Sequence, residues 1–442
     1  MDRVAGLPRQ ILGSVGLRVI SAVMLFAGGV ILARWLGPES LGVYSVVLSL
    51  ASLASLPITS GLPTLVTRET AKAFDSGEHG IIRGLWRFAL GLVLASLLLA
   101  AILLVITSSL QEDSARVPFS YLAIGFLLVP LMGLDLLRGS AMQGLGSGVW
   151  SQMPDALVRP AVFLILLVLG TQVVSGDHLV YGLAANACAA ALSFFVGTIL
   201  LRRITSGRLL PVRAEYHPRV WLRALVSLGA LSATQRVLGN IDVLMLGWLG
   251  PATDVGLYKV ALQGVALMVI VQSAVSAILA ARFSTSFAAG DIEAIRRVSD
   301  HALLLYIAGS AVFVVAFLSF GEQFIVLFFG PRYTGAVAIL TILAIGQLVN
   351  ALTGPVLDIL VMSGHVRPAL ISASVGCLLV IGSATITVPL FGAPGMAIST
   401  ASGVALANLM MAASVKNCVG FDATLLGAIP RWSKGRRRRK LI

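Results

Sequence analysis

The chain has 442 residues, of which 57% are hydrophobic and only 12% are charged, and its mean hydropathy is +0.95. A soluble domain carries about 25% charged residues, so this composition excludes a cytosolic enzyme, a nucleic-acid-binding domain and a disordered chain. The net charge of +13 is therefore attributed to loops beside a membrane, where Lys and Arg gather on one side.

Twelve continuous apolar runs are long enough to cross a bilayer as helices, which takes about 20 residues each. Their apolar residues do not alternate with polar ones, which excludes a membrane β-barrel. The sequence therefore predicts an all-α, polytopic membrane protein. In chain order the predicted membrane helices are 12–34, 42–66, 85–106, 118–137, 157–174, 179–201, 223–249, 256–280, 302–320, 336–362, 368–388 and 393–415.

The basic residues predict the orientation of these helices, because cytoplasmic loops carry an excess of Lys and Arg. With both termini inside, 26 basic residues fall in inside segments and three, Arg34, Arg116 and Arg332, fall in outside loops. We therefore predict that both termini are cytoplasmic. The outside loops are short and leave no room for the extramembrane domain of a membrane-bound enzyme. We expect no catalytic residues, no cofactor and no bound metal.

An internal repeat divides the chain near its middle. The segment WLGPESLGVY begins at Trp35 and WLGPATDVGLY begins at Trp248, and each ends an odd-numbered predicted helix. In both, the glycine is expected to end a helix and the proline to prevent its continuation. Six helices in each repeat predict two lobes that enter the membrane in the same direction, the architecture of an alternating-access transporter. The predicted segments are an N-terminal lobe 1–201, a basic cytoplasmic connector 202–222, a C-terminal lobe 223–415 and a polybasic cytoplasmic tail 416–442.

Several motifs in this order resemble one family of transporters. ARWLGPESLGVYS at 33–45 is followed by a helix that ends at Arg68. LGWLGPATDVGLY follows Asn240-Ile241-Asp242, FGPRY begins at Phe329, and VPLFGAPGMAIST occupies 388–400. The chain thereby resembles bacterial polysaccharide transporters, the O-antigen-type flippases of the multidrug/oligosaccharidyl-lipid/polysaccharide exporter superfamily. The resemblance implies a two-lobed bundle in a bacterial inner membrane that moves a polyprenyl-diphosphate-linked oligosaccharide from the inner to the outer leaflet for surface polysaccharide synthesis.

Charged residues inside membrane helices are costly and are therefore candidates for function. Arg236 lies about 18 Å into the seventh predicted helix, with Asn240 four residues later on the same face. A cavity cation and a structural ion pair are both open for Arg236, and the side chains of Arg18 and Lys259 could instead reach the headgroups. The predicted substrate-binding residues are Arg236, Arg18, Lys259, Asn240, Gln263, Gln347 and Asn350.

The tenth predicted helix carries a polar stripe that includes Gln347, Asn350 and Asp358 on one face. The stripe lines a cavity or makes hydrogen bonds to other helices, and Pro355 is expected to break the helix. Asp242, about 120° around the helix from Arg236, needs another partner or a coupling cation.

Arg138 lies at a position of the fourth predicted helix that corresponds to Asp358 in the tenth. We hypothesise that the two form an inner gate, and the alternative is that Arg138 pairs locally with Asp135, three residues back. Asp242, Asp358 and Arg138 are thus the predicted coupling and gate residues.

Three functions remain open at the level of sequence. The first is the flippase, with a polysaccharide polymerase and glycosyltransferases as expected partners. The second is a cation-coupled drug or small-molecule antiporter of the same superfamily, which would need cavity carboxylates. The third is a membrane scaffold for polysaccharide assembly.

The basic run at 434–440 is expected to bind anionic lipids rather than nucleic acid.

Overall fold

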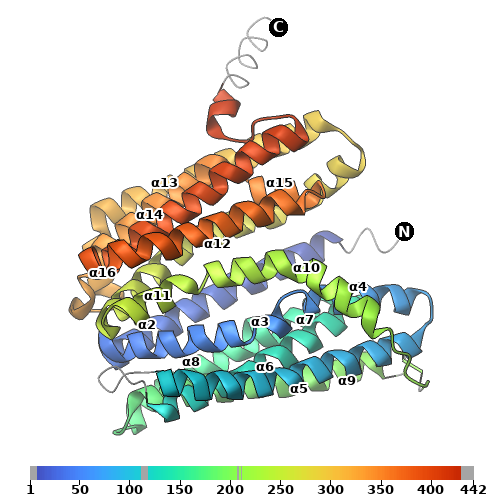
Figure 1. Cartoon of the computed structure of the whole chain (residues 1–442), viewed down its shortest axis with the longest axis horizontal. Helices are drawn as coiled ribbons and strands as arrows, with labels where there is room; N and C mark the ends of the chain where they lie inside the picture. Colours follow the sequence, from blue (N-terminus) through green and yellow to red (C-terminus); the bar gives the residue numbers. More distant parts are fainter. Residues whose placement is uncertain (1–6, 111–117, 207–208, 211, 430–442) are drawn as a thin grey trace, which may run out of the picture. The chain divides into compact units, whose positions relative to one another are not determined.

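The computed structural model describes residues 7–110, 118–206, 209–210 and 212–429. Every regular element in these residues is a helix. Nine of the described helices are long and apolar enough to cross a membrane. The predicted all-α, polytopic membrane fold is thereby confirmed (Figure 1).

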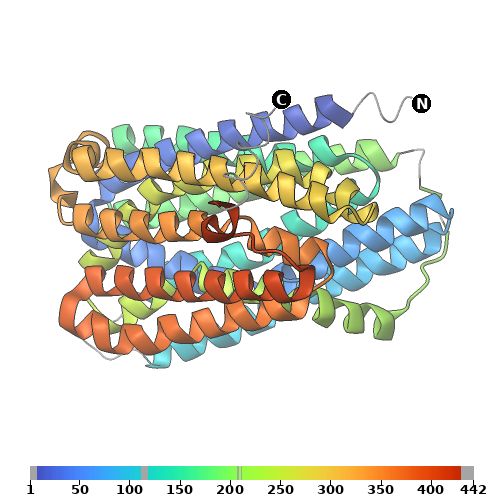
Figure 2. The same cartoon turned by 90° about the horizontal axis from the view of Figure 1, so that it is seen from above.

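Two of the described helices extend over more than one predicted membrane helix: α2 contains the first and the beginning of the second, and α16 contains the last two. α2 (Leu7–Ala54) is interrupted at Gly37, whose φ is 76°, and α16 (Val366–Val419) at Gly392, whose φ is 59°. Glycine takes up positive φ without steric cost, and Pro38 and Pro394 follow within two residues. The two halves of α16 lie side by side (Figure 2), with the Thr387 hydroxyl donating to the Gly395 carbonyl at 3.0 Å. The helix-ending role expected for LGP is confirmed at Gly37.

Three predicted helices are divided in the structure. The run 42–66 is split among the end of α2, α3 (Leu56–Thr59) and α4 (Leu62–Asp75), and the run 223–249 is split into α10 (Pro218–Leu238) and α11 (Ile241–Leu249). The prediction of continuous helices there was wrong. The run 336–362 is split into α14 (Ala336–Thr353) and α15 (Val356–Met362), with the break at Gly354–Pro355 that Pro355 predicted.

The chain folds into two compact units, and the first ends at Asn240. Helix α6 packs against most of the other helices of this unit, above all α9, α4, α5 and α2. Helix α10 packs on α4, where a Cβ at Gly61 would lie 2.6 Å from the carbonyl oxygen of Leu225. The first unit therefore includes α10, which the sequence analysis assigned to the second lobe. Its remaining elements are α5 (His79–Leu110), α6 (Phe119–Gly144), α7 (Gly148–Met153), the π-helix η1 (Pro154–Val158), α8 (Arg159–Val173) and α9 (His178–Thr205).

The second unit begins at Ile241. Helix α14 packs against α13, α16 and α12, so it lies among the long helices of this unit. Asp254 at the start of α12 accepts a hydrogen bond from the Ala393 amide at 3.1 Å, which fixes the turn between the halves of α16. The elements not yet given bounds are α12 (Ala252–Ala288), α13 (Ile292–Phe328) and the 3-10 helix η2 (Pro331–Tyr333).

The outer faces of several helices are apolar and exposed. Leu98 of α5 is 70% exposed and Val312 of α13 is 68% exposed. Soluble proteins rarely expose long apolar faces of this kind. Inside the first unit, the small residues Ala187 and Ala190 of α9 pack against Leu128, and small residues are typical of contacts between membrane helices. The exposed faces are therefore suited to contact lipid.

Asp177 caps the start of helix α9 and lies outside the membrane segments. Asp177 accepts hydrogen bonds from the amides of Leu179 and Val180 and, at 2.6 Å, from the hydroxyl of Tyr121. Burial opposes ionisation of Asp177, but these hydrogen bonds outweigh burial and hold the pKa of its carboxyl below the usual value. The capping interaction is therefore present at neutral pH and is lost as the pH falls through the lowered value.

The orientation can be tested with reporters fused to truncated chains. The excess of 26 basic residues on one side against three on the other predicts that a reporter fused after Ser286 lies in the cytoplasm and one fused after Ala252 lies outside. A pair of reporters active only in one compartment, such as a phosphatase and a fluorescent protein, measures this. The opposite location at either site would contradict the twelve-helix topology.

Candidate functional site

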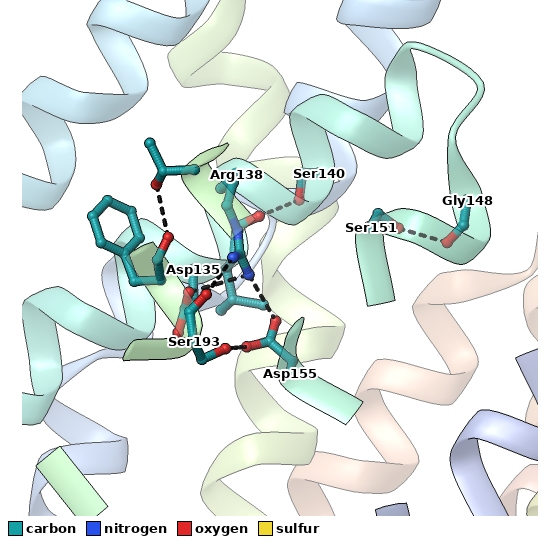
Figure 3. Close-up of polar contacts among 10 residues, drawn as sticks. Asp135, Arg138, Ser140, Gly148, Ser151, Asp155 and Ser193 are labelled. Carbon is teal, nitrogen blue, oxygen red and sulfur yellow. Dashed lines mark hydrogen bonds and ion pairs between the residues drawn. The ribbon is translucent and has the colours of Figure 1, made fainter. Parts of the chain in front are cut away.

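A cluster of charged side chains lies inside the first unit. It is formed by Asp135 and Arg138 of α6, Asp155 of η1 and Ser193 of α9 (Figure 3). The side chains of Asp135 and Arg138 are only 4% and 3% exposed. Asp135 lies nine residues before the end of α6, about 14 Å along the helix. The cluster is therefore set within a membrane span rather than at its end.

Arg138 connects the other members of the cluster. One terminal nitrogen, Nη2, lies 3.1 Å from an oxygen of Asp135 and 3.5 Å from an oxygen of Asp155. The other, Nη1, donates to the backbone carbonyl of Ser193 at 2.8 Å. One guanidinium thus joins three segments, α6, η1 and α9, which is expected to hold them in register because a buried charge is costly to separate from its partners.

Helix α9 provides the space for this guanidinium. A Cβ on Gly197 would lie 1.2 Å from Nη1 of Arg138, so only glycine leaves room for the side chain at this position. Asp155 is presented by the π-helix η1, which begins at Pro154. Short π-helical segments inside membrane or soluble helices are frequent at functional sites.

A second chain of polar side chains joins α8, α9 and α2. Arg159 of α8 donates to the side-chain oxygen of Asn186 at 3.2 Å, and Asn186 donates to the hydroxyl of Tyr44 at 3.0 Å. Tyr44 belongs to α2. Arg159 therefore has a neutral hydrogen-bond partner, whereas Arg138 has two carboxylates.

Arg236 differs from Arg138 and Arg159 in its contacts. It lies in the last turn of α10, is half-buried, and has no hydrogen bond or ion pair with another described residue. Asn240 does not extend the same helix face, because the helix ends at Leu238 and the Asn240 side chain donates to the Arg236 carbonyl at 2.9 Å. The expected shared face of Arg236 and Asn240 was wrong, and Asn240 instead satisfies a carbonyl at the end of α10.

Asp242 lies beyond the break, in the second unit. Its carboxylate is buried and accepts hydrogen bonds from the Tyr258 hydroxyl at 2.9 Å and from the Val243 amide at 2.8 Å. The Tyr258 hydroxyl is also 3.0 Å from the hydroxyl of Thr400. The partner that Asp242 was expected to need is therefore Tyr258. Lys259, next to it on α12, is partly buried and has no hydrogen bond or ion pair with another described residue.

Asp358 joins a polar seam between α12 and α13. It accepts a hydrogen bond from the Ser276 hydroxyl at 2.8 Å, and Ser276 is in turn hydrogen-bonded to Tyr306. One turn along both helices, Gln272 donates to Ser310 at 3.1 Å. Hydrogen bonds between helices, one of the two predicted roles for the polar stripe, are thus present at Asp358.

The remaining predicted residues have simpler surroundings. Gln347 accepts a hydrogen bond from Asn350 at 3.2 Å, so these two members of the stripe pair within α14. The side-chain oxygen of Gln263 is buried without a hydrogen-bond partner in the described part of the chain. The side chain of Arg18 and the basic run at 434–440 lie outside the described residues.

The structure contains the local alternative for Arg138, its pairing with Asp135. Arg138 is enclosed in the first unit by Asp135, Asp155 and Ser193, so the proposed gate would require it to leave three partners. Sequence reasoning missed Asp155, since it began the fifth membrane helix at residue 157. The apolar span in fact begins at Gly148, and the carboxylate directly after Pro154 was the available signal.

Comparisons with known proteins agree with this architecture. A family model described as "Polysaccharide biosynthesis protein" matches residues 9–286, and the MatE model matches residues 228–386. Stage V sporulation protein B of Bacillus subtilis is 21% identical over 430 residues, which cover 90% of this chain and 81% of that protein.

Two solved structures share the fold. One is an inward-facing multidrug resistance MATE family transporter of the MOP superfamily, with a TM-score of 0.71, 14% identity and coverage of 90% of this chain and 94% of that one. The other is the lipid II flippase MurJ in an inward closed conformation, with a TM-score of 0.70, 12% identity and coverage of 92% and 87%. The family match spans more than half of the sequence and confirms the resemblance found in its motifs. The chain therefore belongs to the polysaccharide biosynthesis protein family and has the fold of the MOP-superfamily transporters.

Proposed function

We propose that this protein is an alternating-access flippase that moves a polyprenyl-diphosphate-linked oligosaccharide from the inner to the outer leaflet of a bacterial inner membrane. The family description, polysaccharide biosynthesis, and the fold shared with a lipid II flippase support this choice of cargo. On this proposal both termini are cytoplasmic, the basic tail binds anionic lipids, and a polysaccharide polymerase and glycosyltransferases act beside the transporter.

The cargo explains why a dedicated protein is needed. Each hydroxyl that enters hydrocarbon without a hydrogen bond costs several kcal/mol, and an oligosaccharide carries many hydroxyls beside the charged diphosphate. A polar path through the protein removes most of this cost, while the polyprenyl chain stays in the bilayer.

The observation that carries the proposal is the free guanidinium of Arg236. Arg138 is neutralised by two carboxylates, and Arg159 donates to Asn186. Arg236 has no such partner among the described residues, although it is half-buried. An unpaired cation that is partly removed from water is costly unless it serves a ligand, and guanidinium groups bind phosphate oxygens through two parallel hydrogen bonds. A diphosphate is the ligand that this side chain fits best.

A cation-coupled antiporter is the second candidate. Asp242 and Asp358 are carboxylates of the short helices α11 and α15, and both lie in the region matched by the MatE model, 228–386. Carboxylates of this kind would bind a cationic drug or a coupling ion. Each already accepts a hydrogen bond from a hydroxyl, Tyr258 or Ser276, which makes them less available to a drug than Arg236 is to an anion.

The membrane potential should assist export. A diphosphate with about two negative charges gains roughly 4.6 kcal/mol when it moves outward across 100 mV, negative inside. In vesicles that contain the purified protein, an imposed inside-negative potential should accelerate outward movement of the cargo, and the same lipid-linked sugar without its diphosphate serves as the control. If the potential has no effect, charge movement must be compensated by a counter-ion.

Cells that lack the protein test the function directly. They should lose surface polysaccharide and accumulate lipid-linked oligosaccharide that an impermeant probe added from outside cannot reach, while their sensitivity to cationic drugs stays unchanged. Intact surface polysaccharide together with increased drug sensitivity would favour the antiporter instead.

A further inference from the structure

The chain turns back after the last long helix of the second unit. Helix α16 ends at Val419, and Gly420 follows with a φ of 85°, the left-handed conformation that commonly ends a helix. The residues after it cross the same unit (Figure 2), and three of their side chains are buried: Phe421, Ala423 and Ala428. We call residues 420–429 the strap.

The strap has a defined local structure. One oxygen of Asp422, Oδ1, accepts hydrogen bonds from the amide of Thr424 at 3.0 Å and from its hydroxyl at 2.7 Å. An aspartate that bonds to the backbone two residues later forms a tight turn. The Ala428 amide then donates to the Thr424 carbonyl at 3.0 Å, and residues 425–429 are helical. The strap therefore holds a fixed shape.

Two contacts attach the strap to the helices that it crosses. The Phe421 ring is 3% exposed, and the guanidinium of Arg296 on α13 lies 5.7 Å from the centre of this ring, within the range of a cation–π interaction. Arg296 is held in turn by Glu293 at 2.9 Å. The second contact is the Ala423 carbonyl, which lies so close to Gly354 that a Cβ there would be 2.8 Å from its oxygen.

The second contact lies at the break between α14 and α15. Gly354 follows α14 directly with a φ of 75°, which glycine adopts without steric cost, and Pro355 precedes α15. Helix α15 carries Asp358, which accepts the hydrogen bond from Ser276 of α12. A segment that lies on Gly354 therefore restricts how far α15, with its part of the polar seam, can move relative to α14.

The opposite face of the strap is apolar and exposed. Leu426 is 80% exposed and Ile429 is 50% exposed. The chain from Lys416 onward contains eight basic residues and one acidic residue, and the run KGRRRRK begins at Lys434, five residues after Ile429. Exposed apolar side chains beside a block of Lys and Arg are typical of segments that lie on anionic membrane surfaces.

We propose that the strap binds an anionic lipid surface through Leu426, Ile429 and the basic run that follows them. Binding holds the opposite face, Phe421 and Ala423, in place and thereby fixes the break between α14 and α15. The lipid composition of the membrane then sets how often α15 moves away from α14. The inference rests on the proposed function only for the contact between the basic run and anionic lipid, and it does not depend on the cargo.

Hydrogen exchange tests the lipid contact without any cargo. The purified full chain is placed in nanodiscs of phosphatidylcholine alone or of phosphatidylcholine with phosphatidylglycerol, and mass spectrometry follows amide exchange in 354–364. We expect exchange to be slower by at least about threefold in the anionic bilayer, because the locally open state is less populated. Replacement of all four arginines at 436–439 by glutamine should remove this difference, and Leu426→Ser should reduce it.

A second variant tests the contact between the strap and the break. Phe421→Ala should speed exchange in 354–364 about tenfold in both bilayers, because loss of a buried ring raises the population of the locally open state. Phe329→Ala is the matched control, since Phe329 is 1% exposed and lies at the opposite end of α13 from Arg296. It removes an equally buried ring and should leave exchange in 354–364 near the wild-type rate.

Two results would overturn the proposal. Equal exchange of 354–364 in the two bilayers would exclude anionic lipid as the partner of the strap. Equal exchange in Phe421→Ala and Phe329→Ala would show that the strap does not hold the break. If Phe421→Ala does not fold, the variant with glutamine at 436–439 decides, because a lipid effect that persists in it contradicts the proposal.

Discussion

Replacement of Gly197 by alanine should destabilise the N-terminal unit by about 3–5 kcal/mol, the cost typical of parting a buried charge from its partners. The added Cβ would lie 1.2 Å from Nη1 of Arg138, so the guanidinium must move. Although it is the flexible end of a long side chain, movement separates it from the Ser193 carbonyl, Asp135 and Asp155. The midpoint of thermal unfolding in detergent micelles measures the effect.

Gly91→Ala is the matched control for this substitution. Gly91 lies in α5 of the same unit, and apart from its chain neighbours and the backbone of its own helix turn no atom is within 4 Å of the position its Cβ would take. Alanine is favoured over glycine inside a helix by about 1 kcal/mol, so Gly91→Ala should be neutral or slightly stabilising. Equal unfolding midpoints for the two variants would mean that Arg138 finds another arrangement of the same free energy, and that the cluster does not hold α6, η1 and α9 together.

Replacement of Arg236 by alanine should reduce transport at least about tenfold, because a hydrogen bond to a charged group contributes about 1.5–3 kcal/mol. Arg236→Lys should keep part of the activity, since an ammonium still attracts a diphosphate but cannot bind two oxygens at once. The rate of cargo movement in vesicles and the amount of inserted protein are measured together. Removal of an unpaired cation should leave insertion unchanged.

Arg223→Ala supplies the control on the same helix. Arg223 is exposed near the start of α10, and it is one of the basic residues from which the orientation was predicted. Transport by Arg223→Ala should stay near the wild-type rate. If Arg236→Ala and Arg223→Ala transport equally well, Arg236 is not part of the cargo path.

The membrane segments could be predicted from the sequence, because lipid requires long apolar runs and short basic loops. The interruptions were harder to predict. Pro355 indicated the break between α14 and α15, but the break at Gly239–Asn240 has no proline. An apolar run looks the same whether its backbone is continuous or not, so the separation of Arg236 from Asp242 required the structure.

In the candidate sites, too, local contacts could be predicted from the sequence and contacts between distant segments could not. The spacing of Asp135 and Arg138 by three residues predicted their contact as one alternative. The contacts of Asp155 and Ser193 with Arg138 depend on how η1 and α9 pack against α6. Gly197 is important only because the Arg138 guanidinium occupies the space that a side chain at this position would take. Contacts between distant segments of this kind leave no periodic pattern in one sequence.

Reconstitution tests the proposed function most directly. The purified chain is placed in vesicles whose lipid includes a fluorescent polyprenyl-diphosphate-linked oligosaccharide, and an impermeant quencher reports how much of the label can reach the outer leaflet over time. We predict that the wild-type protein makes the inner-leaflet label accessible, and that protein-free vesicles and vesicles with Arg236→Ala remain near the starting value. Accessibility that rises no faster with the wild-type protein than without protein would contradict the account.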